Sequence, residues 1–93
     1  MAIYVDELRH YPGQKWKWCH MATDGNIEEL HTFAEKIGLK RQWFQVHPVL
    51  SHYDLTPSKR ALALRQGATE ETSKTMILLC TKRDDLNYLR ANR

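Results

Sequence analysis

The stretch that decides the fold is SHYDLTPSKR, residues 51–60. It joins the end of an apolar segment to the start of a helix, because Thr56 is suited to cap a helix and Pro57 to occupy its first turn. Small α/β proteins hold polar ligands where a strand ends beside the start of a helix. His52 and Asp54 are two positions apart, so their side chains face the same way if the segment is extended. The stretch therefore predicts a strand-to-helix junction with a polar site beside it.

The length and composition indicate one small domain. The chain has 93 residues, of which 42% are hydrophobic, and a formal net charge of +3. This is enough apolar material for one modest core, so we expect a single domain over residues 1–93, with disorder confined to the last few residues. The mild positive charge permits a phosphate-bearing partner but is also typical of an ordinary solvated surface.

The cysteines and the lack of a long apolar run bear on the location of the protein. Cys19 and Cys80 lie in apolar runs and do not form a Cys-x-x-Cys pair. We interpret both as reduced and buried, which fits a cytoplasmic protein. No stretch is long and apolar enough to cross a membrane, and the N-terminus lacks the pattern of a signal peptide. We therefore predict a cytoplasmic protein without a membrane partner.

The rest of the chain alternates between strand and helix patterns. Strands are expected at residues 3–5, 15–22, 46–55 and 68–71. Because Pro48 interrupts the third of these, that strand should start late, near Val49. Helices are expected at residues 27–37, 57–66 and 73–80, and single turns at 40–45 and from Asp84 to Leu89. The apolar run 75–80 fits a strand equally well, and we choose a helix. This order predicts an α/β layer fold with three to four short strands, two to three helices and an at least partly parallel sheet.

Helix ends are marked by capping residues. Asn26, with Glu29 three positions later, resembles a capping box. Gly38 and Gly67 follow the two helical patterns, where a left-handed C-cap belongs. These signals delimit the first two helices from both sides.

Several short motifs together resemble a known family. They are Tyr4-Val5-Asp6, Trp18-Cys19-His20-Met21 before Asp24, Glu29-Leu30-His31-x-Phe33-Ala34 with Gly38, His52-Tyr53-Asp54, and Gly67-Ala68. Over most of residues 3–71 the chain resembles the family known as domain of unknown function 4031. The resemblance implies a small bacterial or phage-borne intracellular domain and brings no established activity.

Five side chains from separate elements form a candidate reactive site: Asp6, His20, His31, His52 and Asp54. Three imidazoles and two carboxylates are ligands that zinc and other divalent ions favour, and a metal would lower the pKa of a bound water. A metal-free acid–base site of His20, His52 and Asp54 is an equal alternative. Structural roles are the third interpretation: His20 and His31 as histidines at the core boundary, and Asp54 beside a helix dipole. Tyr53 should point the opposite way from its neighbours, into the core.

Two hypotheses about function follow. The first is a phosphate-directed enzyme, a hydrolase if catalytic, or a ligand-binding domain. In it His20, His52 and Asp54 are catalytic, and the ligand-binding residues are Asp6, His31, Lys59, Arg60 and Arg41, of which the three cations would hold a phosphate oxygen.

The second hypothesis is a non-enzymatic binding module for nucleic acid or a protein partner. The runs Lys15-Trp16-Lys17-Trp18 and Arg41-Gln42-Trp43-Phe44 interleave basic and aromatic residues, as single-strand nucleic-acid binders do. Core packing explains Trp16 and Trp18 equally well, since both lie on one face of the expected strand. A homodimer that buries this tryptophan-rich edge is compatible with the small size of the chain.

Overall fold

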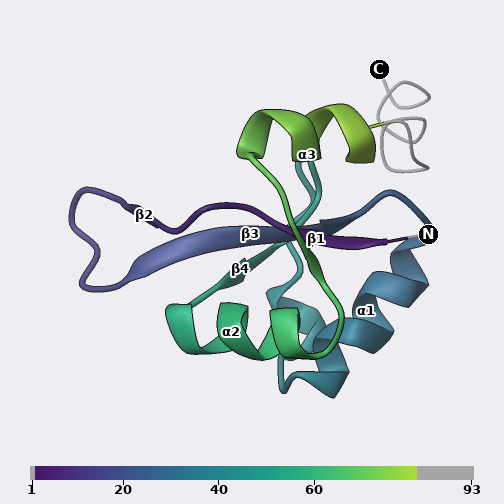
Figure 1. The fold of residues 1–93 in the computed structure, drawn as a ribbon, viewed down its shortest axis with the longest axis horizontal. Helices are drawn as coiled ribbons and strands as arrows, with labels where there is room; N and C mark the ends of the chain where they lie inside the picture. The colour runs from purple at the N-terminus through teal and green to yellow at the C-terminus, as the bar shows by residue number, and fades with distance from the viewer. Residues whose placement is uncertain (1, 82–93) are drawn as a thin grey trace.

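The computed structural model describes residues 2–81, which form a sheet between two helical layers (Figure 1). The elements are β1 (Ile3–Val5), β2 (Arg9–His10), β3 (Lys17–Thr23), α1 (Ile27–Lys36), the 3₁₀ turn η1 (Arg41–Trp43), β4 (Tyr53–Leu55), α2 (Pro57–Arg65), β5 (Thr69–Glu70) and α3 (Ser73–Cys80). Helices α1 and α2 lie on one side of the sheet and α3 on the other (Figure 1). The predicted α/β layer fold is therefore confirmed.

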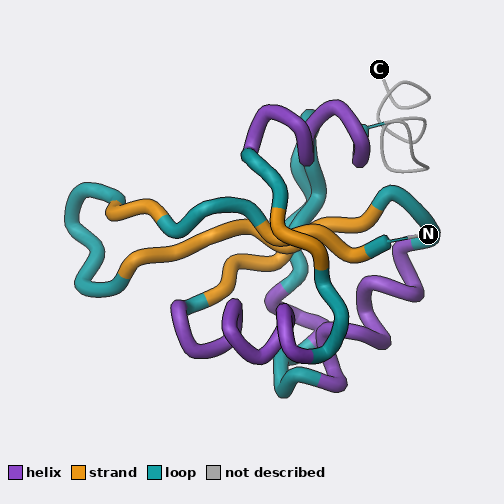
Figure 2. Tube along the Cα trace, viewed as in Figure 1, coloured by secondary structure: helices purple, strands orange, loops and turns teal. Residues whose placement is uncertain are grey.

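The sheet is mixed and centred on β3. Strands β1, β2 and β4 each pair with β3 in antiparallel orientation, and β5 pairs with β1 in parallel. Figure 2 shows the strands in orange, between the helices in purple. The parallel pair was expected from the helices between the strands. In the β3–β4 register His20 lies directly opposite Asp54.

Alternation along the strands divides the apolar side chains between two clusters. The larger cluster packs the sheet against α1 and α2, and its fully buried members are Val5, Cys19, Met21, Leu30, Ala34, Ile37, Tyr53, Leu55 and Ala63. The smaller cluster packs the sheet against α3 and contains Ala22, Leu50, Met76 and Cys80. Both cysteines are free and buried, as predicted, and they lie in different clusters. Tyr53 is fully buried in the larger cluster, as the alternation predicted.

The helix boundaries follow the capping signals. The side chains of Asn26 and Thr56 accept backbone hydrogen bonds at the starts of α1 and α2. Gly38 has φ +87° and Gly67 has φ +109°, the left-handed region that glycine adopts without strain. Thr72 caps α3, which contains residues 75–80, so the prediction of a helix rather than a strand for this run is confirmed.

Three predicted strands have other boundaries, and one strand was not predicted. Strand β3 is Lys17–Thr23 rather than 15–22, and β5 is Thr69–Glu70 rather than 68–71. Strand β4 starts at Tyr53 rather than near Val49, because residues 46–50 form a loop and only the Gln45–His52 bridge precedes the strand. Strand β2 was not predicted, because its two residues are polar and exposed and depend on β3 for pairing. The expected turn from Asp84 to Leu89 lies outside the described residues. Within residues 2–81, no helix combines the length and apolar character needed to span a bilayer.

Candidate functional site

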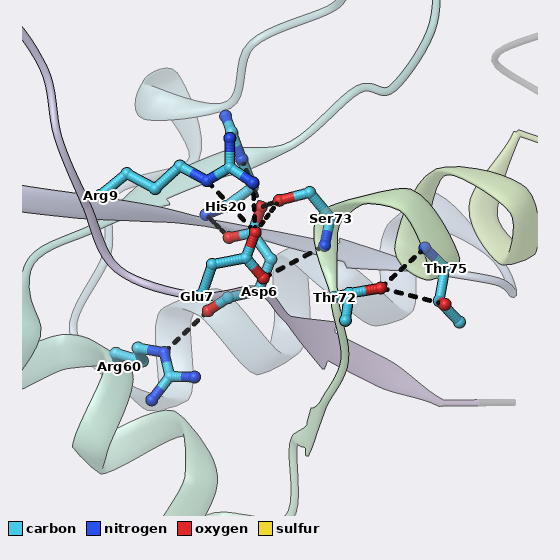
Figure 3. Close-up of polar contacts among 8 residues, drawn as sticks. All are labelled: Asp6, Glu7, Arg9, His20, Arg60, Thr72, Ser73 and Thr75. Carbon is cyan, nitrogen blue, oxygen red and sulfur yellow. Dashed lines mark hydrogen bonds and ion pairs between the residues drawn. The ribbon is translucent and has the colours of Figure 1, made fainter.

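Asp6 and His20 form a polar pair across β1 and β3. Asp6 directly follows β1, and its buried carboxylate accepts hydrogen bonds from the His20 backbone N–H (2.6 Å) and from the Ser73 hydroxyl (2.8 Å) (Figure 3). The Nδ1 atom of His20 lies 2.8 Å from the same carboxylate. Because an ionised carboxylate only accepts hydrogen bonds, Nδ1 carries the proton and Nε2 is the free ring nitrogen.

The electrostatics of Asp6 support its ionised form. Burial on its own raises the pKa of this carboxyl, but the hydrogen bonds from His20 and Ser73 outweigh burial and hold the pKa below its ordinary value. The Arg60 side chain also donates to the backbone carbonyl of Asp6, at 2.8 Å. Asp6 is therefore a fixed negative charge behind His20.

His52 is oriented in the same way as His20, but by the backbone. Its Nδ1 lies 2.7 Å from the Leu50 carbonyl oxygen, an acceptor, so Nδ1 again carries a proton. Its Nε2 lies 3.3 Å from a carboxylate oxygen of Asp54, whose other oxygen accepts a hydrogen bond from Gln45. Burial lowers the pKa of His52, but the bonds to Asp54 and Leu50 outweigh burial and raise it overall. The bond from His52 lowers the pKa of Asp54 against a smaller opposing effect of burial.

The three side chains predicted to be catalytic come together. One ligand atom each from His20, His52 and Asp54 can be chosen so that all lie within 4.8 Å of one another. The two imidazole rings meet edge to face, with centroids 4.7 Å apart. Cross-strand pairing of His20 with Asp54 and the two-residue spacing of His52 from Asp54 place all three on the same face of the sheet.

This cluster lies at a pocket of about 410 Å³. The other lining residues are Tyr11, Gln14, Trp18, Cys19 and Gln45. The side chains of His20 and Asp54 are 32% and 37% exposed, so a ligand in the pocket reaches them. Among the described residues that line this pocket, none is lysine or arginine.

His31 lies elsewhere, on the opposite face of β4. Its Nδ1 is 2.6 Å from the Tyr53 hydroxyl, and its ring meets Phe44 edge to face at 4.7 Å. Burial, followed by the charge of Arg41, lowers its pKa. The structure thus separates His31 from the His20–His52–Asp54 cluster and places it against the core.

The three cations expected to hold a phosphate oxygen have other partners. The Lys59 ammonium donates to the Ile37 carbonyl at the end of α1, at 2.7 Å. The Arg60 guanidinium bridges the Asp6 carbonyl and a glutamate of β5. Arg41 forms an ion pair with a glutamate of α1. Of these, Arg60 touches the site, through the backbone of Asp6, and Lys59 lines a neighbouring groove.

Ser73 and Gln45 contribute to the site without having been predicted. Ser73 opens α3 and reaches Asp6 only because β5 pairs in parallel with β1, a long-range event with no local sequence signal. Gln45 reaches Asp54 because it bridges His52 across the loop of residues 46–51. The Gln45–His52 bridge that closes the loop joins two polar residues, and a periodic pattern of apolar residues does not indicate such a bridge.

The tryptophans of the second hypothesis are partly exposed. Trp16 is 56% and Trp43 is 48% exposed, and the Lys15 and Lys40 ammonium groups lie 5.3 and 5.7 Å from their ring centroids. Trp18, in contrast, lines the pocket beside His20.

Comparison with known proteins finds one family. The family described as "Protein of unknown function (DUF4031)" matches residues 3–83, which include every residue of the cluster. No curated protein and no solved structure matches the chain.

Proposed function

The chain belongs to the DUF4031 family, and from the geometry of its polar cluster we propose that it is a metal-dependent hydrolase. His20, His52 and Asp54 would hold a divalent ion, most suitably zinc, at the pocket beside β3 and β4. Two histidines and a carboxylate are the ligand set of one class of catalytic zinc sites, which leaves a position for water.

One observation carries this proposal: both imidazoles are held by their Nδ1 atoms. The acceptor is the Asp6 carboxylate for His20 and the Leu50 carbonyl for His52. Metal-binding histidines usually donate their second ring N–H to such an acceptor, which fixes the tautomer and makes the free nitrogen more basic. The 3.3 Å between His52 Nε2 and Asp54 also matches the distance of about 3.3 Å between two ligands of a tetrahedral zinc ion.

The chemistry available at the site is water activation. His20, His52 and Asp54 would hold the ion, and zinc held there would supply an activated water, because zinc enzymes lower the pKa of the bound water to about 7. Gln45 orients the Asp54 carboxylate, and Asp6 orients the His20 ring through the proton on Nδ1. A phosphate group in this pocket would be held by the ion itself, because Lys59, Arg60 and Arg41 have the other partners described above.

The first test is a calorimetric zinc titration of the protein purified without a tag. We expect one zinc ion per chain, and at least 100-fold weaker binding in His52→Ala and in the nearly isosteric Asp54→Asn. His10→Ala is the matched control, because His10 is an exposed histidine on β2 outside the cluster. Circular dichroism should show that all three variants are folded.

The second test concerns hydrolysis. Zinc-loaded protein should hydrolyse 4-nitrophenyl acetate or bis(4-nitrophenyl) phosphate, and both a chelator and Asp54→Asn should abolish the activity. Equal zinc affinity in wild type and His52→Ala would overturn the metal site. Turnover that persists in chelator would favour the metal-free acid–base alternative, and preference for ferrous iron with oxygen consumption would overturn the hydrolytic assignment.

The second candidate is the binding module, favoured by the exposure of Trp16 and Trp43 beside lysines. A single-stranded nucleic acid stacked on these rings would bind more weakly as salt rises. Absence of binding to single-stranded DNA and RNA at low salt would exclude its nucleic-acid version.

A further inference from the structure

A second hollow begins where the proposed metal pocket ends. It is a groove of about 640 Å³ beside β4, with Leu39, Trp43 and Phe44 among its walls. Trp18, Gln45 and Asp54 line both the groove and the pocket. A molecule whose reacting group lies at the cluster can therefore continue directly into the groove.

The walls of the groove suit a flat apolar group. Phe44 packs on the rings of His31 and Tyr53, which holds it in place, whereas Trp43 is 48% exposed to solvent. An exposed tryptophan next to other apolar side chains is typical of a binding surface, and stacked rings are favourable partners for an indole.

The groove has the size of a binding site for a small molecule. Sites for small molecules commonly measure about 300–1,000 Å³ and combine apolar walls with a few polar groups. Here the polar groups are those of the junction, Gln45 and Asp54, together with Thr56 and Lys59 at the start of α2.

We propose that the substrate carries a planar aromatic group, which binds in the groove against Trp43 and Phe44 while its hydrolysable bond lies at the His20–His52–Asp54 cluster. This inference rests on the proposed function for the placement of the reacting bond. The aromatic subsite itself depends only on the groove.

A pair of hydroxamates tests the inference on zinc-loaded protein. Acetohydroxamic acid offers only the zinc-binding group, whereas 2-naphthohydroxamic acid adds a planar double ring. We expect the naphthyl compound to bind at least tenfold more tightly to wild type, because its ring leaves water for an apolar groove. Trp43→Ala should remove most of this advantage and leave the affinity for acetohydroxamic acid unchanged. Trp16→Ala is the matched control, because Trp16 is similarly exposed but does not line the groove.

The outcomes separate this inference from the proposed function. If zinc binds but the two hydroxamates bind equally well, the aromatic subsite is wrong and the metal site stands. If zinc does not bind, 2-naphthol and metal-free protein still test the groove: NMR shifts of the Trp43 indole on titration support it, and their absence overturns it. Concentration-dependent dimerisation that Trp43→Ala abolishes would assign the groove to a second copy of the chain and also overturn the inference.

Discussion

Two histidines of this protein are equally buried and lie in opposite environments. His31 is 7% and His52 is 8% exposed, yet the pKa of His31 is lowered and that of His52 is raised. They lie on opposite faces of β4, separated by the alternation of Tyr53 with its neighbours. Burial therefore does not distinguish a structural histidine from a candidate ligand in this fold.

The partners of the two rings make the difference. His31 meets a phenol and a phenyl ring, and its hydrogen bond to Tyr53 joins two neutral groups inside the core. His52 lies between a carbonyl and a carboxylate, which both attract positive charge, and faces a second imidazole. The surroundings of His52 therefore favour a cation, either a proton or a metal ion, whereas those of His31 favour the neutral ring.

The largest effect should come from His31→Ala. The substitution removes a ring packed against Phe44 and leaves the Tyr53 hydroxyl buried without its partner, so we expect a loss of about 2–4 kcal/mol in the free energy of unfolding. Urea unfolding in the presence of a chelator measures it. His52→Ala should cost less stability but abolish zinc binding, which His31→Ala should leave within twofold. If one substitution proves worse in both measurements, the division between the two histidines fails.

Asp6→Asn should weaken zinc binding by about 10- to 100-fold without removing a ligand. The amide can still accept a hydrogen bond from His20, but the negative charge that lies behind the metal-binding ring is lost. Competition with a fluorescent zinc chelator measures the change.

Glu7→Gln is the matched control for Asp6→Asn. Glu7 also accepts a hydrogen bond from Ser73, through the Ser73 backbone N–H, but its other partner is Arg9 rather than His20. Zinc affinity should stay within twofold of wild type. An equal loss in both variants would mean that Ser73 and the start of α3, rather than the bond to His20, control the site.

The prediction from sequence succeeded where local periodicity determines the outcome. Period-two alternation correctly put His52 and Asp54 on one face and Tyr53 on the other, and it put His20 on the opposite face of β3 from Cys19 and Met21. Thr56 and Asn26 marked helix starts because capping is a contact between near neighbours.

The predictions that failed depend on contacts between segments that are far apart in the sequence. His31 lies on α1, but the sequence of this helix does not tell which face of the sheet the helix covers, so His31 was grouped with residues on the opposite face. Strand β2 forms only because β3 offers it a partner, and Ser73 reaches Asp6 only through the β1–β5 pair. Contacts between distant segments carry no periodic signal within either segment.

Tyr53→Phe should cost about 1 kcal/mol in the free energy of unfolding. It keeps the ring in the core and removes only the hydroxyl, so His31 Nδ1 is left without its buried partner. Urea unfolding measures the loss. Tyr4→Phe is the control, since the Tyr4 hydroxyl donates to Asp24 at a longer distance of 3.2 Å in a less buried place, and it should cost less. A larger loss for Tyr4→Phe would show that the Tyr53–His31 bond adds little to the core.

The smallest effect is a difference in pH dependence between the two histidines in metal-free protein. A lowered pKa means that His31 stabilises the fold fully above 6.5 and that this contribution is lost as pH falls from 6.5 through its pKa in the folded protein. A raised pKa means the reverse for His52, whose contribution is complete below 6.5 and is lost as pH rises through its higher pKa.

NMR titration of the histidine ring protons resolves the two directions, with each signal assigned from its alanine variant. The midpoint of His31 should lie below 6.5 and that of His52 above it. Because the two contributions change in opposite directions, the free energy of unfolding of wild type should vary less between pH 5 and 8 than that of His31→Ala, in which only the loss of the His52 contribution with rising pH remains. If both midpoints fall on the same side of 6.5, the two faces of β4 do not differ in the charge that they favour, and the electrostatic reason for separating the two histidines is lost.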